Sequence, residues 1–139
     1  MSSRRKCREL VLKTLYASEI REMNWEKLLG PMLEQSKVNP KDEAFIQSLI
    51  KQILEHEDKI DDLIKNKLEH WDFKRLNSVD RIILKMGVCE MLYFPDIPVK
   101  VSIDEAIELA KKFSSGEAGK FVNGILDAIA KSNKEILAK

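Results

Sequence analysis

Apolar side chains recur along this chain at the three- and four-residue spacing of amphipathic helices. The clearest stripe lies in residues 42–54, where Phe45, Leu49, Ile50 and Ile53 share one helical face. Strict alternation of apolar and polar positions, which is typical of half-buried strands, is scarce. The pattern therefore predicts an all-α protein.

Breaks in the apolar pattern divide the chain into about seven helices. Ser114-Ser115-Gly116 interrupts the pattern, and Asn77 offers a side-chain oxygen that can cap a following helix. Ser102, with Glu105 three residues later, has the spacing of a capping box that opens a helix. Beyond residue 132 the tail is expected to fray. The expected helices are residues 4–20, 25–35, 42–54, 60–68, 79–93, 102–113 and 117–132.

The same periodicity predicts the core. Hydrophobic residues make up 44% of the 139 positions, which is enough for one domain over residues 1–139 with a substantial core. The predicted core side chains are Leu15, Leu49, Ile53, Ile64, Ile83, Met86, Leu109, Phe113, Ile125 and Ile129.

Charge and targeting signals restrict the class of protein. The net charge is only +1, so any nucleic-acid surface must come from an uneven distribution of charge. No charged start is followed by the apolar stretch of a secretory signal, and no apolar run approaches the roughly 20 residues of a membrane span. We therefore expect a cytoplasmic protein without a membrane partner, in which Cys7 and Cys89 are reduced.

The first expected helix begins with a basic cluster. Residues 1–13 carry five positive side chains against one acid, and four of the five are Arg4, Arg5, Lys6 and Arg8. Cations at a helix N-terminus are unfavourable to the helix dipole, so a phosphate partner is one explanation for them. A solvated tail with incidental basic residues is the other, and spacing alone does not decide between the two.

A second group of interest lies in the last expected helix. Lys120 and Phe121 place a cation beside an aromatic ring, a combination on which RNA-binding proteins stack unpaired bases. Asn123 could form a hydrogen bond to a base edge. Gly124 lies in the middle of the helical pattern at a cost of about 1 kcal/mol relative to alanine, which indicates close packing or a functional contact. Plain core packing of Phe121 is the alternative that periodicity favours.

Catalytic and metal chemistry have little support. Glu90 falls on an apolar helix face, where a carboxylate must be paired, with Arg75 or Arg81 as conceivable partners. No nucleophile or second acid accompanies it at a recognisable spacing. His56 and His70 are isolated from each other and from any cysteine cluster, so neither a metal nor a cofactor is expected.

The sequence resembles the NusB family of bacterial transcription antitermination factors. The segments that carry the resemblance are residues 102–113 (SIDEAIELAKKF) and 120–127 (KFVNGILD), preceded by Asp96-Ile97-Pro98. The arginine-rich start and a middle region that includes Trp71 and Asp80-Arg81 follow the family's order and spacing. Each fragment alone is weak, but all of them in this order are specific.

The resemblance implies a fold and a set of partners. It implies two packed helical bundles that bind the boxA element of ribosomal RNA leader transcripts together with NusE, a small-subunit ribosomal protein, and that join the elongating RNA polymerase. It implies that Asp80 faces NusE. Glu117 stands where the family often has aspartate beside the RNA, a change that keeps the charge but lengthens the side chain. The implied RNA contacts are Arg4, Arg5, Lys6, Arg8, Glu117, Lys120, Phe121 and Asn123.

Other interpretations remain open at this stage. Similar helical domains precede some ribosomal RNA cytosine methyltransferases, but this sequence ends at Lys139 without a cofactor-binding domain, so we expect the stand-alone factor. A helical protein–protein adaptor without direct RNA binding is the second hypothesis, and a small enzyme that uses Glu90 is the third. No motif decides between a monomer and a homodimer.

Overall fold

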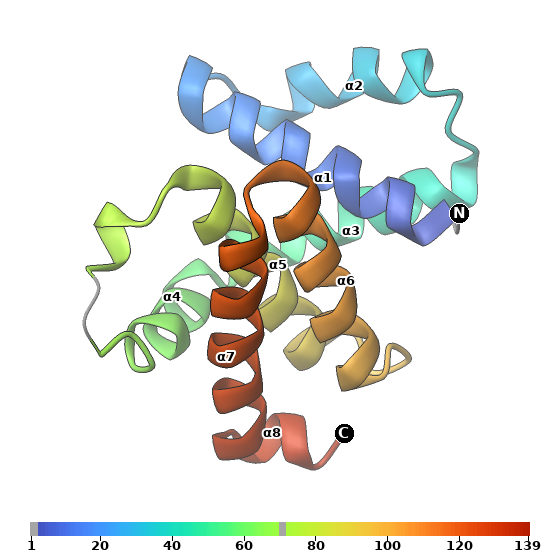
Figure 1. The fold of residues 1–139 in the computed structure, drawn as a ribbon. Helices are drawn as coiled ribbons and strands as arrows, with labels where there is room; N and C mark the ends of the chain where they lie inside the picture. The colour runs from blue at the N-terminus through green and yellow to red at the C-terminus, as the bar shows by residue number, and fades with distance from the viewer. Residues whose placement is uncertain (1–2, 70–71) are drawn as a thin grey trace. The chain divides into compact units, whose positions relative to one another are not determined.

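The computed structural model describes residues 3–69 and 72–139, and these residues form helices and no strand (Figure 1). This confirms the predicted all-α class. The seven expected helices are present, together with a short 3-10 helix and one further helix near the C-terminus. The helices are α1 (Ser3–Arg21), α2 (Trp25–Gln35), α3 (Pro40–Glu55), α4 (Glu57–Lys65), the 3-10 helix η1 (Phe73–Arg75), α5 (Ser78–Tyr93), α6 (Val99–Phe113), α7 (Gly116–Ser132) and α8 (Lys134–Leu137).

The helices form two compact units, Met1–Lys51 and Gln52–Lys139. In the first unit α1 packs against α2, and Thr14 Oγ1 lies 3.3 Å from Met32 Sδ across that contact. Val11, Ile46 and Leu49 are fully buried there. The first unit therefore contributes buried apolar side chains from α1 and from α3.

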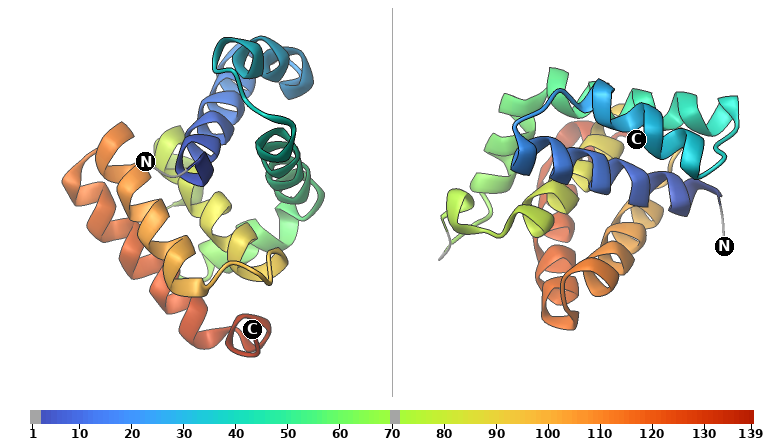
Figure 2. Two further views of the ribbon diagram at one scale, coloured as in Figure 1. Left: turned by 90° about the vertical axis from the view of Figure 1, so that its right-hand side faces the viewer. Right: turned by 90° about the horizontal axis from the view of Figure 1, so that it is seen from above.

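The second unit is organised around α5, which contacts α4, α6, α7 and α8. Nine residues between Ile82 and Met91 are buried, so most of the surface of this helix is covered by its neighbours. The left view of Figure 2 shows α6 and α7 running side by side. Gly87 lets α5 and α7 approach closely, because a Cβ atom there would lie 2.7 Å from Leu126 Cδ1.

Two expectations about helix ends are wrong. The helix expected to open at Ser102 begins at Val99, because Pro98 occupies the N-cap position and fixes the entry of the chain. Ser102 is instead buried and donates a hydrogen bond to Glu90 Oε1 at 3.0 Å. The tail does not simply fray, since it forms α8, whose Ile136 is 3% exposed.

Most of the predicted core side chains are buried, but three are only half-buried. The buried ones are Leu49, Ile53, Ile64, Ile83, Met86, Leu109 and Ile129. Leu15, Phe113 and Ile125 are half-buried, because they lie at the edges of their apolar stripes. None of the described helices is long and apolar enough to span a membrane.

Candidate nucleic-acid interface

The basic cluster of α1 divides into two pairs of cations. The guanidinium carbon of Arg4 lies 3.9 Å from the centroid of the Phe45 ring, and that of Arg8 lies 5.8 Å from it. Arg8 is only 4% exposed and Arg4 is half-buried. Arg5 and Lys6 are exposed. One aromatic ring of α3 therefore holds two of the four cations, and the other two face solvent.

The start of α3 fixes the position of this ring. Pro40 is the first residue of the helix, and Asn39 before it accepts a hydrogen bond from the backbone N–H of Asp42 at 2.8 Å. Cys7 of α1 lies against the same turn, with Sγ 3.9 Å from the carbonyl oxygen of Asp42. Burial raises the pKa of the Cys7 thiol to about 11, so this side chain is neutral at physiological pH.

The group on α7 begins at a capped helix terminus. Ser115 Oγ accepts a hydrogen bond from the backbone N–H of Ala118 at 3.0 Å. Glu117 and Lys120, in the first two turns, have side chains that are 87% and 81% exposed, and their charged ends are 3.5 Å apart. Such a surface pair adds little stability. Both charges therefore remain accessible to a ligand.

Phe121 lies in a groove of about 490 Å³ that also contains Asp80 and Glu117. The ring is half-buried, and its contact with RNA stays a prediction. Asn77 and Ser115 line the same groove. The structure thus brings the residue assigned to NusE next to two residues assigned to RNA.

Asp80 is held by the cap of α5. Its backbone N–H donates to Asn77 Oδ1 at 2.8 Å, and its Oδ2 accepts from Asn77 Nδ2 at 3.0 Å. The other carboxylate oxygen, Oδ1, is buried and has no hydrogen-bond partner within residues 3–69 and 72–139. Leaving a buried carboxylate oxygen without a hydrogen-bond donor costs free energy.

Lys120 and Asn123 open toward a different hollow, of about 630 Å³. Lys111 of α6 and Ser115 share it, so a second cation lies near the N-terminus of α7. Sequence reasoning missed Lys111 as a site residue. No helical spacing connects residues on two separate helices, and only the packing of α6 against α7 brings them together.

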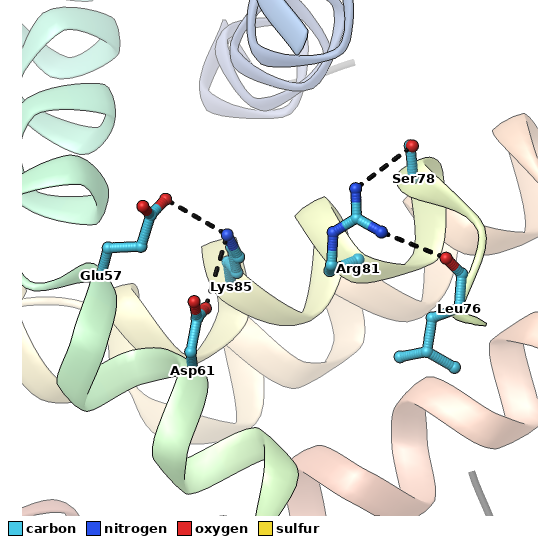
Figure 3. A network of polar contacts seen from close by, with 6 residues as sticks. All are labelled: Glu57, Asp61, Leu76, Ser78, Arg81 and Lys85. Carbon is cyan, nitrogen blue, oxygen red and sulfur yellow. Dashed lines mark hydrogen bonds and ion pairs between the residues drawn. The ribbon is translucent and has the colours of Figure 1, made fainter. Parts of the chain in front are cut away.

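A second polar network in the same unit is structural. Lys85 of α5 lies 3.2 Å from Glu57 and 3.4 Å from Asp61, both on α4, and Figure 3 shows the ammonium group between the two carboxylates. Arg81, one turn earlier, donates to the carbonyl oxygen of Leu76 and to Ser78 Oγ (Figure 3). Burial is the largest influence on Asp61 and raises its pKa, while Lys85 opposes this shift.

Among the described residues no group of three or more histidine, cysteine or acidic side chains is arranged to hold a metal ion. Glu90 is bonded to Ser102, and the ammonium of Lys139 donates to its backbone carbonyl oxygen at 3.1 Å. These contacts give Glu90 a role in joining α5 to α6 and to the C-terminus. His70 and Trp71 lie outside the described residues.

Sequence comparisons give one family. The model of the NusB family matches residues 5–131. A transcription antitermination protein NusB from Nitratiruptor sp. is 41% identical over 134 residues, covering 96% of each chain. A protein of the same name from Pseudothermotoga lettingae is 42% identical over 132 residues, covering 95% of this chain and 94% of the relative.

Solved structures give the same family. The chain matches T. maritima NusB with a TM-score of 0.88 and 39% identity, over 100% of this chain and 99% of that one. It also matches a chain in the crystal structure of the antitermination factors NusB and NusE in complex with double-stranded RNA. There the TM-score is 0.85 and the identity 28%, over 96% of this chain and 99% of the other.

Proposed function

Because the chain belongs to the NusB family, we propose that it is a transcription antitermination factor that binds boxA RNA of ribosomal RNA leaders together with NusE. In this proposal residues 1–139 act as one RNA-binding module without a catalytic step, and the complex joins elongating RNA polymerase. The antitermination relatives support the class of activity, and the similar NusB–NusE–RNA complex supports the two kinds of partner.

The observation that carries the proposal is the accessible group on α7. An 81% exposed lysine, a half-buried phenylalanine ring and an exposed asparagine lie within four residues of one another on a helix. A cation can neutralise a phosphate, a ring can stack on an unpaired base, and an amide can bond a base edge. Arg5 and Lys6 add exposed cations on α1.

The test of RNA recognition is binding of the whole chain to a boxA RNA and to a scrambled RNA, each with and without NusE. We expect a preference for boxA that NusE strengthens. Equal binding to the two RNAs would contradict the proposed specificity. Binding to NusE with no RNA binding under either condition would favour the adaptor hypothesis instead.

Two lysines of α7 provide a matched pair for this experiment. Lys131, like Lys120, is exposed and pairs with an acid on its own helix, Asp127, at 2.9 Å. It lies eleven residues further along, which is about 16 Å on a helix. Lys120→Ala should weaken boxA binding, whereas Lys131→Ala should leave it unchanged.

The NusE surface needs a separate variant. Asp80→Asn removes the charge but keeps the size of the side chain, so the cap of α5 is disturbed little. We expect weaker binding to NusE with unchanged RNA binding by the isolated protein. Asp104→Asn is the control, because Asp104 is an exposed acid of α6 whose ion pair, with Lys100, runs along its own helix. Equal NusE affinities for the two variants would remove Asp80 from the interface.

A further inference from the structure

Gly124 occupies the middle of α7 without a structural reason. Glycine destabilises a helix interior relative to alanine, so its presence there calls for an explanation. A positive φ is no explanation, since no glycine of the described chain has one. Of the two explanations that the sequence suggested, close packing is excluded as well, because a Cβ atom at Gly124 would meet nothing within 4 Å among the described residues.

Two other glycines show what a packing requirement looks like. A Cβ atom at Gly87 would lie 2.7 Å from Leu126 Cδ1, and one at Gly119 would lie 3.2 Å from Lys111 Cγ. Both glycines allow neighbouring helices to approach. Within residues 3–69 and 72–139 Gly124 has no such neighbour, so packing between the described helices does not account for it.

Gly124 lies on the outward face of α7, next to Lys120. Val122, Leu126 and Ile129 are buried, and at 100° per residue Gly124 points away from them. One turn before it on the outward side is Lys120, whose side chain is 81% exposed.

The charges beside Gly124 favour a polyanion. Lys120 keeps only a 3.5 Å contact with Glu117, so its ammonium group can turn toward a phosphate. Asp127, one turn after Gly124, is paired with Lys131 at 2.9 Å, which offsets the repulsion that this acid would exert on an RNA strand. Phe121, three residues before Gly124, supplies an aromatic edge at the same place.

We infer that Gly124 is itself an RNA-binding residue, which leaves the backbone of α7 bare so that the sugar–phosphate backbone of a bound strand can lie in van der Waals contact with it. The inference rests on the proposed function. It adds an RNA contact made by the helix backbone at a residue that has no side chain. A methyl group at this position would hold the strand away from the helix and from Lys120.

The test is the RNA affinity and melting temperature of Gly124→Ala and Gly124→Gln. Alanine should keep or raise the melting temperature, because it is the better helix former and meets open space. The affinity for boxA RNA should nevertheless fall about tenfold for alanine and further for glutamine. The dependence of affinity on salt should not change, because no cation is removed.

Ser132→Thr is the matched control. It adds one methyl group to the exposed last residue of the same helix, about 12 Å further along, and keeps the hydroxyl that bonds to Ala128. Its RNA affinity should equal that of the unmodified protein. An equal affinity for Gly124→Ala would overturn the inference, while RNA binding by the unmodified protein would keep the proposed function intact.

Binding to NusE tests whether the bare backbone at Gly124 serves RNA or a protein partner. Gly124→Ala should bind NusE as the unmodified protein does. If the variant failed to bind NusE and kept RNA binding, the bare backbone would serve a protein partner and the inference would be wrong. If the unmodified protein bound no RNA at all, the proposed function would fall together with the inference.

Discussion

The N-terminus of α1 and the outward face of α7 both place cations beside an aromatic ring, but they use the ring differently. On α1 the ring of Phe45 is 7% exposed and holds Arg4 and Arg8 within the unit. On α7 the ring of Phe121 is half-buried, and Lys120 stands in solvent. The same pairing of residue types stabilises the fold in one region and remains accessible to a ligand in the other.

This difference teaches that residue type does not separate structural from ligand-binding cations. Among the four basic residues expected to contact RNA from α1, Arg8 is almost fully buried, whereas Arg5 and Lys6 are exposed. A buried guanidinium beside a ring contributes packing and cation–π attraction to the folded state. Exposed cations contribute little to stability and can be used for binding.

The largest expected effect comes from removing each ring in turn. Phe45→Ala should reduce the free energy of unfolding by about 3–5 kcal/mol, because it leaves a cavity and removes the surface on which Arg4 and Arg8 lie. Phe121→Ala should cost less than half as much stability but about 1–3 kcal/mol of RNA binding. Urea denaturation and RNA titration measure the two quantities. Equal losses of stability would erase the contrast between the two regions.

A smaller effect is expected within the basic cluster of α1. Arg8→Met keeps most of the apolar stem but should still cost about 2 kcal/mol, since it removes a desolvated cation–π contact. Arg5→Met, on the exposed side, should change stability by no more than about 0.5 kcal/mol. Thermal denaturation of both variants measures these two losses of stability. A greater loss for Arg5→Met would reverse the assignment of structural and accessible cations.

Lys85 is a third structural cation, held by the acids Glu57 and Asp61 and not by an aromatic ring. Lys85→Met should cost about 1–2 kcal/mol at pH 7, because Asp61 is then left partly buried without its main counter-charge. In the folded protein the pKa of Asp61 is already raised by burial, and removal of Lys85 raises it further. The ionised carboxylate therefore destabilises the variant above this raised pKa, and the destabilisation should fade as the pH falls through it and Asp61 binds a proton.

Urea denaturation at pH 7 and near pH 4 checks this prediction. Lys100→Met is a suitable control, because Lys100 is 86% exposed and pairs with Asp104 on its own helix. The control should show no comparable dependence on pH. A destabilisation of Lys85→Met that stayed constant between the two pH values would mean that Asp61 is not the group responsible.

Local sequence signals predicted most of the helices, because periodicity and capping act within a few residues. Asn77 caps α5 as its position indicated, and the expected break at Ser115 is where α7 begins, with Ser115 as its N-cap. Ser102 also had a capping signature, yet its hydroxyl donates to Glu90, twelve residues away on another helix. A local motif cannot reveal that tertiary packing has assigned the side chain to a different partner.

The candidate site was predictable in residue type but not in arrangement. Phe45 and Arg4 lie on different helices, far apart in the sequence, and no spacing rule relates them. Likewise, the groove that joins Asp80 to Phe121 exists only because α5 and α7 pack together. Sequence patterns therefore identified the cations and the ring of α7, while burial decided which of the cations remain available to a ligand.

The salt dependence of RNA binding tests the central claim most directly. On single-stranded RNA, the slope of log K against log salt concentration should fall by about 0.7 for each phosphate that a variant no longer neutralises. We predict a fall of about 0.7 for Lys120→Ala and about 1.4 for the double variant Arg5→Ala and Lys6→Ala, with the folded state intact. Lys131→Ala should keep the slope of the unmodified protein. Slopes that were identical for all four proteins would contradict RNA binding through the exposed cations of α1 and α7.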